Sequence, residues 1–300
     1  MGKSFHICKL EYLDYLESAR NFSVNSIRAY SHDLSILADF LHTENLDFRN
    51  LNSRNVRSFA GSLNRRALKE SSVNRIISSV KGFYKYCIKY ENMENNVFSH
   101  VRSISSTRRI PDILSFAEIN KMIELTDNTF LGIRDRVILE MLYSTGCRVS
   151  ELVLLKVSDV NINKRMALVY GKGGKSRWVF LTRGTTDVLS SYLALRKVKI
   201  AGSSHNEDFM LILNRNGSGI SARGIRFIIN KYIDAIGISK HISPHTFRHT
   251  FATHMLNNGA GIRVVQEMLG HSSIATTQIY THIGIDKLKD VYRVSHPHGR

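Results

Sequence analysis

The sequence contains few of the residues that crosslink or interrupt a fold. Three prolines and three cysteines occur among its 300 residues. Cys8, Cys87 and Cys147 are odd in number, lie far apart and form no C-x-x-C motif, which argues against a disulfide framework and against a thiolate metal site. We expect the three to be small buried hydrophobic side chains.

The chain also lacks the segments that place a protein in or across a membrane. No apolar run comes near the ~18 residues that a membrane-spanning helix needs. The N-terminal stretch MGKSFHICKLEYLDYLES has no uninterrupted apolar core of the kind found in a signal peptide. We therefore expect a cytoplasmic protein without a membrane partner.

Acidic residues are in deficit. The sequence has 25 Asp and Glu against 42 Lys and Arg, which gives a formal net charge of +17. The basic excess extends over both halves of the chain and is not confined to a tail. Such a charge favours an extended polyanion as partner, with nucleic acid as the leading candidate and an acidic membrane surface as the alternative.

Because prolines are scarce, Pro111 is informative. It ends the stretch HVRSISSTRRIP at residues 100–111, which is polar and basic and has little apolar periodicity, as is typical of an interdomain linker. A chain of this length favours about two domains, at ~150 residues each. We predict an N-terminal domain at residues 1–105, a linker at residues 106–112 and a second domain at residues 113–300.

The N-terminal part has the apolar spacing of amphipathic helices. Helices are predicted in residues 9–20, 26–44, 55–63 and 71–91, the last with Ser71 or Ser72 as N-cap. This part therefore reads as a bundle of about four helices. Several of its basic side chains are candidates for contacts to a phosphate backbone, or else ordinary solvated charges: Arg28, Arg65, Arg66, Lys69, Arg75 and Lys81.

The second part mixes helices with one hairpin. Ser115 and Glu118 form a capping box, a helix is predicted to end at Gly146, and Arg148 and Glu151 are spaced to lie on one helix face.

The stretch RMALVYGKGGKSRWVFL at residues 165–181 has two β-rich runs around a glycine-rich turn, which predicts a hairpin with Lys172 and Lys175 on its turn. Lys175 and Arg177 are interpreted as contacts to a nucleic-acid backbone or as hairpin surface, and Trp178 is expected to pack on the core. The predicted fold class is mainly α with a small antiparallel β-sheet.

Residues 243–254, SPHTFRHTFATH, concentrate histidine on one predicted helix. Ser243 and Pro244 are a suitable N-cap and first-turn pair, and Gly259 is a suitable stop, so residues 245–257 are predicted to be helical. Phe247, Phe251 and Met255 then share a core face, while His245, Arg248 and His249 lie on another.

This second face is compatible with two kinds of site. Histidines at positions i and i+4 are a usable zinc spacing, but no further ligand is near them in the sequence, and Arg248 would repel a cation. A phosphate clamp fits the residue types better, because guanidinium holds two oxygens at once and imidazole moves protons near neutral pH.

Four motifs in this order resemble those of the tyrosine recombinases, specifically the bacterial Xer-type enzymes: TGCRVSEL, GKGGKSR, HTFRH and LGHSSIATTQIYTH. The resemblance spans nearly the whole chain. It implies that residues 1–105 are a helical, SAM-like core-binding domain that contacts DNA, and that residues 113–300 are an α+β catalytic domain with a C-terminal tail. It also implies that residues 286–300 dock on a neighbouring subunit, with a frayed terminus as the simpler alternative.

The resemblance assigns roles to particular residues. Arg148 and Arg248 would hold the non-bridging oxygens of a scissile phosphodiester, and His271 would complete this set. Tyr280 would be the nucleophile, Lys172 would protonate the departing 5′ oxygen and His245 would assist proton transfer, with Glu151 in a supporting position. No metal or nucleotide cofactor is implied. His249 and His254 match no catalytic position and are expected to be dispensable for the chemical step.

The function implied is site-specific recombination through a 3′-phosphotyrosine intermediate, which would resolve chromosome or plasmid dimers at short inverted-repeat (dif-like) sites. The partners implied are double-stranded DNA with two inverted arms, a tetramer of this chain alone or with a paralogue, and a DNA translocase as activator. The alternatives are a phage or mobile-element integrase, a type IB topoisomerase, and a DNA-binding protein that has kept the fold without catalysis.

Overall fold

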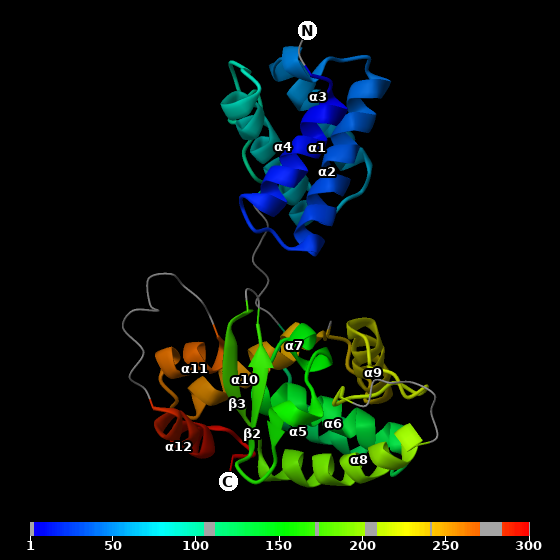
Figure 1. Ribbon diagram of the computed structural model, residues 1–300, viewed down its shortest axis with the longest axis vertical. Coiled ribbons are helices and arrows are strands. Elements are labelled where there is room, and N and C mark those ends of the chain that lie inside the picture. Colours follow the sequence, from blue (N-terminus) through cyan, green and yellow to red (C-terminus); the bar gives the residue numbers. More distant parts are fainter. Residues whose placement is uncertain are drawn as a thin grey trace. The chain divides into compact units, whose positions relative to one another are not determined.

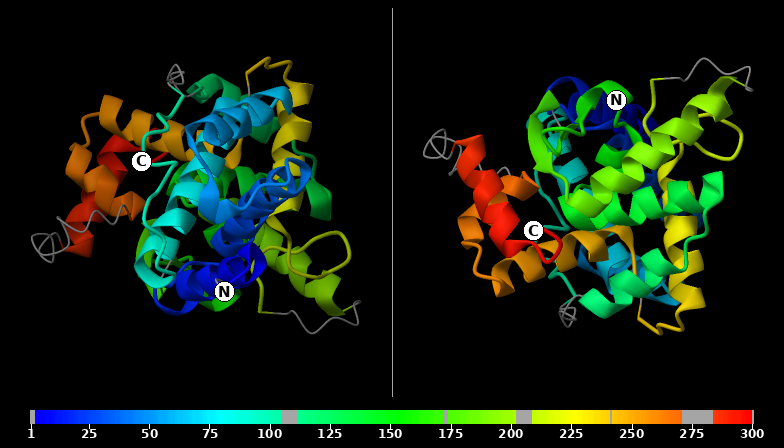
Figure 2. Two further views of the ribbon diagram at one scale, coloured as in Figure 1. Left: turned by 90° about the horizontal axis from the view of Figure 1, so that it is seen from above. Right: turned by 90° about the horizontal axis from the view of Figure 1, so that it is seen from below.

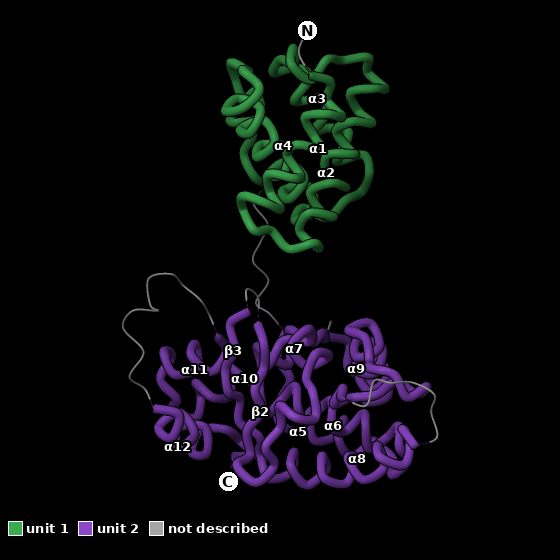
Figure 3. Tube along the Cα trace, viewed as in Figure 1, with its two compact units in different colours: residues 1–109 green, residues 110–300 purple. Residues whose placement is uncertain are grey.

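The computed structural model describes residues 3–104, 112–171, 174–201, 209–240, 242–270 and 284–299. The chain divides into two compact units, unit 1 at Met1–Arg109 and unit 2 at Ile110–Arg300 (Figure 3). The predicted domain borders and the linker between them stay predictions, because residues 105–111 lie outside the described residues.

Unit 1 is helical (Figure 1). Its elements are α1 (Phe5–Ser18), α2 (Val24–Thr43), the 3-10 turn η1 (Phe48–Asn50), α3 (Ser53–Arg65) and α4 (Glu70–Tyr90). Buried apolar rows such as Leu34 and Leu37 on α2 and Ile76 and Val80 on α4 form its core, because residues three and four apart lie on one helix face. The four predicted helices are confirmed.

The predicted cap of α4 was wrong. The helix begins at Glu70, with Lys69 in the N-cap position and no side-chain cap hydrogen bond. Ser71 and Ser72 therefore lie inside the first turn. The Glu70 carboxylate suits that turn, since negative charge is favourable near the exposed N–H groups of a helix N-terminus.

The segment after α4 packs back onto unit 1. Phe98 is fully buried, and the Asn96 side chain donates to the Lys81 carbonyl at 3.1 Å and accepts from the Phe98 amide at 3.1 Å. The Asn74 side chain likewise exchanges two hydrogen bonds with the backbone of Ile104, at 2.8 and 2.7 Å. The fold of unit 1 thus includes the chain as far as residue 104.

In unit 2, the other elements pack around a central helix, α6 (Phe130–Thr145). Val137, Ile138, Leu139, Met141 and Leu142 are all fully buried, and a helix with apolar residues buried around most of its circumference is one that other elements cover. The covering helices are α5 (Phe116–Glu124), α7 (Val149–Val153), α8 (Arg183–Ala201), α9 (Ala222–Ala235) and α10 (Pro244–Asn257).

The predicted hairpin is confirmed. β2 (Met166–Tyr170) and β3 (Ser176–Phe180) pair antiparallel, from Met166 opposite Phe180 to Tyr170 opposite Ser176. A short strand that the sequence pattern did not predict, β1 (Val160–Asn161), follows the 3-10 turn η2 (Val157–Asp159) and pairs with β2 on its other side. The prediction that Trp178 packs on the core was wrong. It is 40% exposed, and this face of β3 is buried only from Phe180, two residues further on. The predicted fold class is confirmed.

Helix α10 lies between two apolar clusters. Phe247 belongs to the main core around α6, whereas Phe251 and Met255 belong to a smaller cluster with Val265 and Met268 of α11 (Ile262–Leu269). The three residues predicted for the core face of α10 are all buried. A helix packed on two sides is a rigid support for the side chains between those contacts.

Helix α12 (Ile285–Ser295) packs on the same domain, beside α10 and α11. Figures 1 and 2 show α10, α11 and α12 together on one side of unit 2 and α9 on the other. Tyr292 donates to the Ser144 carbonyl at 3.0 Å, and the buried His296 stacks on the Tyr292 ring at 4.9 Å. The expected docking of residues 286–300 on a neighbouring subunit stays a prediction.

Among the residues that the structure describes, no helix is both long and apolar enough to cross a membrane.

Candidate active site

Arg148 and Glu151 form a capping interaction at the start of α7. The Arg148 amide donates to Glu151 Oε2 at 2.7 Å, and its guanidinium Nη1 donates to Glu151 Oε1 at 2.9 Å. Arg148 is the residue before the helix, so the two residues meet around the first turn and not along one helix face, as the spacing had suggested. The Arg148 side chain stays 38% exposed, whereas that of Glu151 is only 2% exposed.

Arg177 of β3 holds the same carboxylate from the other side. Its Nη1 and Nη2 donate to Glu151 Oε1 and Oε2 at 2.9 and 2.8 Å, and its Nε donates to the Met268 carbonyl at 2.9 Å. Burial alone would raise the pKa of the Glu151 carboxyl, but the hydrogen bonds from Arg177 and Arg148 outweigh it and hold this pKa below its usual value. Glu151 is therefore an ionised bridge between two arginines.

Arg248 of α10 is bound by backbone carbonyls. Its Nη1 donates to the Gly146 carbonyl at 2.8 Å and its Nη2 to the Leu269 carbonyl at 2.5 Å. Arg248 is 8% exposed. Burial, and then the charges of Arg148 and Arg177, lower the pKa of its guanidinium to about 10. Arg248 is therefore still a cation at neutral pH. No carboxylate among the described residues forms an ion pair with it.

Two glycines set the backbone around these arginines. Gly146, at the C-terminus of α6, and Gly270, at the C-terminus of α11, both adopt left-handed conformations with φ of 58° and 65°, which only glycine adopts without strain. A Cβ at Gly146 would approach Phe251 to 2.6 Å, and one at Gly270 would approach Arg177 to 3.0 Å. Both positions therefore need the absence of a side chain.

The histidines of α10 have separate environments. His245 and His249 are exposed, whereas His254 is half-buried and its Nδ1 is 2.9 Å from the Tyr143 hydroxyl. Burial lowers the pKa of His254. His254 is thus a packing residue in contact with α6, and His245 lies on the first turn of α10, one turn before Arg248.

Three predicted catalytic residues, Lys172, His271 and Tyr280, lie outside the described residues. The structure does describe the residues that precede two of them, Gly171 and Gly270. Gly171, which directly precedes Lys172, lies near the carboxylate, since a Cβ there would be 3.6 Å from Glu151 Oε1. Gly270 directly precedes His271 and contacts Arg177. The structure therefore brings Arg148, Glu151 and Arg248 together and leaves the other roles as predictions.

The predicted DNA-contact residues differ in their surroundings. Arg28, Arg65, Arg66 and Lys69 in unit 1 and Lys175 in unit 2 are exposed. Arg75 pairs with the fully buried Asp33, and the Lys81 ammonium donates to the Val101 carbonyl at 2.6 Å. These two side chains thus have structural partners within unit 1.

Two further features bear on other kinds of site. Within the described ranges, no three His, Cys, Asp or Glu side chains are grouped so as to hold a metal ion. All three cysteines are buried and unpaired, as expected, and burial raises the pKa of the Cys147 thiol to about 11, which keeps it protonated and unreactive near neutral pH.

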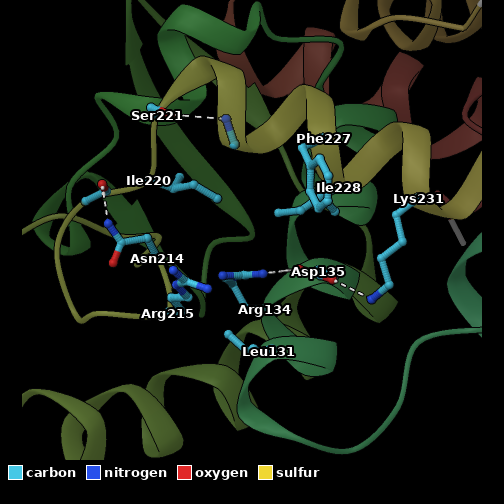
Figure 4. A pocket seen from close by; sticks show the side chains of 12 residues that line it. Leu131, Arg134, Asp135, Asn214, Arg215, Ile220, Ser221, Phe227, Ile228 and Lys231 are labelled. Carbon is cyan, nitrogen blue, oxygen red and sulfur yellow. Dashed lines mark hydrogen bonds and ion pairs between the residues drawn. The ribbon is translucent and has the colours of Figure 1, made fainter.

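A pocket of about 390 Å³ lies between α6, the 214–221 loop and α9 (Figure 4), and neither Arg148 nor Arg248 lines it. Its floor includes the buried ion pair of Arg134 and Asp135, whose carboxylate also accepts from Tyr232 at 3.1 Å. The described residues that line it include none of those predicted for the site. The pair has partners within the fold, so it is explained as part of the packing.

The sequence analysis missed the partnership of Arg177 with Glu151. These residues are 26 positions apart and lie on a strand and a helix, so no local spacing links them. Strand periodicity gives no signal either, because Lys175 and Arg177 are two positions apart and are expected on the same face.

Comparison with known proteins identifies the family. The model of the Phage integrase family matches residues 112–285, and that of the Phage integrase N-terminal SAM-like domain matches residues 10–91. The tyrosine recombinase XerC of Oceanobacillus iheyensis is 38% identical over 95% of this chain and 94% of its own length. The tyrosine recombinase XerD of the same organism is 34% identical over 96% and 97%.

A solved structure of similar fold is that of the XerH site-specific recombinase bound to its palindromic difH substrate. It matches with a TM-score of 0.71 and 22% identity, over 95% of this chain and 84% of that chain. An identity this low supports only a similarity of fold, and that fold agrees with the family match. From the family models and the two curated relatives together, this chain belongs to the phage integrase family and is a tyrosine recombinase.

Proposed function

We propose that this chain is a Xer-type site-specific recombinase that cuts and rejoins DNA through a covalent bond between Tyr280 and a 3′ phosphate. The observation that carries the proposal is the arginine cluster. Arg148 and Arg248 are held around the left-handed turn at Gly146. Arg148 and Arg177 share the Glu151 carboxylate, whereas Arg248 binds the Gly146 carbonyl. This leaves net positive charge for a phosphate.

The chemistry assigned to the site balances without a cofactor. The Tyr280 hydroxyl gives up its proton, with His245 as the proposed acceptor, and its oxygen attacks the scissile phosphorus. The bond to the 5′ oxygen breaks, and Lys172 supplies the proton that this oxygen takes up. Arg148, Arg248 and His271 stabilise the charge that develops on the non-bridging oxygens, and His245 assists proton transfer. Because a phenol has a pKa near 10, the nucleophile depends on this cationic pocket and a proton acceptor.

DNA binding is proposed to involve both units. Exposed basic side chains supply salt-dependent contacts to the phosphate backbone, and those proposed for this role are Arg28, Arg65, Arg66, Lys69 and Lys175. Residues 1–105 would act as the core-binding domain, and residues 113–300 as the catalytic domain. Arg75 and Lys81 also belong to the proposed set, although Asp33 and the Val101 carbonyl bind them, and the Arg75 side chain is 47% exposed.

The biological role proposed is the resolution of chromosome or plasmid dimers at an inverted-repeat site, with four subunits on two DNA duplexes. Support comes from the curated relatives, since both XerC and XerD of one organism match this chain over nearly its full length. The subunits would be copies of this chain or of this chain and a paralogue, and a DNA translocase is the proposed activator.

The test is trapping of the covalent intermediate. A cognate site is first selected by binding from a pool of randomised duplexes, and a nick is then placed beside the cleavage position, so that the short 5′-hydroxyl fragment is lost after cleavage. The wild-type protein should give a protein–DNA adduct on a denaturing gel, and Tyr280→Phe should give none. Identical behaviour of the two proteins would overturn the proposal.

Two outcomes would favour the alternatives. Relaxation of a supercoiled plasmid that lacks the selected site would indicate a type IB topoisomerase. Tight, specific binding without strand cleavage under any condition would indicate a DNA-binding protein that has kept the fold.

A further inference from the structure

Arg177 was predicted to contact DNA or to lie on the hairpin surface, but its hydrogen bonds are made within the protein. The two terminal nitrogens hold both oxygens of Glu151 at 2.9 and 2.8 Å, and Nε binds the Met268 carbonyl at 2.9 Å. The side chain is 14% exposed. A guanidinium that is planar and engaged on two edges is fixed in orientation, which leaves little freedom for a phosphate contact.

On one side, Arg177 acts on Arg148 through the shared carboxylate. Glu151 accepts from the Arg148 amide at 2.7 Å and from its side chain at 2.9 Å. The two oxygens of Glu151 thus serve Arg148 and Arg177 together, and the Glu151 side chain is 2% exposed. A rotation of this carboxylate would move the Arg148 side chain, and Arg177, which binds both oxygens, opposes such a rotation together with the Arg148 amide.

On the other side, Arg177 holds the end of α11. It binds the Met268 carbonyl, while Arg248 binds the next carbonyl, that of Leu269. Carbonyls in the last turn of a helix have no partner within the helix, and cations are favourable there. Gly270 then turns the chain with φ of 65° against the Arg177 side chain, to which a Cβ would come within 3.0 Å.

We propose that Arg177 is a positioning residue for strand cleavage: it fixes Arg148 through Glu151 and fixes the end of α11 relative to Arg148 and Arg248. This inference rests on the proposed function. It replaces the predicted DNA contact at this position by a role inside the protein. Arg177 connects β3, α7 and α11, so a single side chain sets the relative places of segments that are far apart in the sequence.

The first test separates positioning from DNA contact with Arg177→Lys on the nicked, selected duplex. Lysine keeps the charge but cannot supply a bidentate pair and a third, fixed N–H. The single-turnover cleavage rate at saturating DNA should fall about tenfold to a hundredfold, as expected for a misplaced catalytic group. The binding constant and its dependence on salt should stay unchanged.

The neighbouring Lys175→Ala provides the contrast. Lys175 is exposed on the same hairpin, and loss of a phosphate contact should weaken binding and reduce the salt slope by about one. Arg177→Gln, which removes the charge as Lys175→Ala does, completes the comparison. If it shows this reduced slope with a normal cleavage rate at saturation, Arg177 is a DNA contact and the proposal is wrong.

The second test asks whether Arg177 acts through Glu151. The cleavage rates of Arg177→Lys, Glu151→Gln and the double variant form a cycle. If the two residues act in series, the double variant loses no more than the worse single variant. Losses that multiply would show independent roles and would contradict the proposed route.

A third measurement needs no activity. The amides of Arg148 and Gly270 donate to Glu151 and to the Glu267 carbonyl at 2.7 and 2.9 Å. Their hydrogen exchange in DNA-free protein should speed up in Arg177→Lys and stay unchanged in Lys175→Ala. Unchanged exchange in both variants would overturn the positioning role. If the wild-type protein forms no adduct, the proposed function is wrong. The hydrogen-exchange comparison still decides whether Arg177 positions these two segments, because it needs no DNA cleavage.

Discussion

Arg248 and Arg148 are stabilised in different ways, and this difference bears on phosphate binding. Arg248 is held by two neutral carbonyls, from Gly146 and Leu269, so its full charge is available to an anion. Arg148 shares Glu151 with Arg177. The four side chains together carry a net charge of about +2, which is favourable in a site that must bind a phosphodiester and stabilise the further charge of its transition state.

At the residue scale, His245 and His249 make a matched pair on α10. Both are exposed on the same helix, but only His245 corresponds to a position with an assigned role in proton transfer. His245→Ala should lower the cleavage rate on the nicked duplex by about 10²-fold or more, the size of a lost acid–base group. His249→Ala should change it by less than about threefold. The measurement is single-turnover adduct formation.

Equal losses in the two histidine variants would contradict this assignment, because they would point to a general effect of helix surface charge. DNA affinity measured for both variants in parallel is the control that separates chemistry from binding.

At the scale of elements, the turn between α6 and α7 fixes the arginine cluster. Gly146 ends α6, its carbonyl binds Arg248, and Arg148 follows two residues later. Phe251 of α10 fills the space where a side chain at Gly146 would project. The same turn therefore positions both arginines, and its left-handed conformation depends on glycine.

Gly146→Ala should destabilise the protein by about 2–4 kcal/mol, from the strain of a left-handed alanine together with the overlap on Phe251. Gly237 is the matched control, because it has φ of 69° and no atom within 4 Å of the added Cβ. Gly237→Ala should cost only about 1 kcal/mol. Denaturant unfolding measures both, and equal losses would show that the contact with Phe251 is unimportant.

The C-terminal segment is attached through a neutral histidine. His296 is buried, its Nε2 lies 3.3 Å from the Tyr143 carbonyl and must donate to it, and its Nδ1 accepts from the His298 amide at 3.1 Å. A second proton would break this last bond. Burial, with smaller effects from His298 and His254, lowers the pKa of His296 to about 3.

This attachment predicts a pH dependence. In the unfolded chain His296 has a pKa of about 6.5, so between pH 6.5 and 3 the unfolded state binds a proton that the folded state does not. Stability is therefore complete above pH 6.5 and falls as the pH is lowered, by about 2 kcal/mol at pH 5 for this group.

His296→Phe should remove this contribution, so the difference in unfolding free energy between variant and wild type should shift by about 2 kcal/mol between pH 7 and pH 5. A difference that stays constant with pH would show that folding does not lower the pKa of His296, and would contradict this account. Hydrogen exchange in residues 284–299 would locate the change.

At the scale of the whole molecule, much of the fold could be predicted because it follows from local patterns. Apolar spacing indicated the helices of unit 1, and two β-rich runs around a glycine-rich turn indicated the β2–β3 hairpin. The Ser115–Glu118 capping box was found as predicted. Local patterns failed where tertiary contacts decide. Trp178 is exposed although Phe180, on the same face of β3, is buried, and α4 begins at Glu70 without a side-chain cap.

The candidate site was predictable only in part, for the same reason. Arg148, Glu151 and Arg248 were identified through motifs, and the structure brings them together. The partner of Glu151 was not, since Arg177 reaches it from a strand 26 residues away. Lys172, His271 and Tyr280 lie outside the described residues, so their roles depend on chemistry that experiment must test.

The most direct test of the central claim is to identify the residue that is linked to DNA in the trapped adduct. After digestion with nuclease and trypsin, mass spectrometry should find the nucleotide on the peptide of residues 264–287, in which Tyr280 is the only tyrosine. A nucleotide on the peptide of residues 290–293, which contains Tyr292, or on any other peptide would contradict the account.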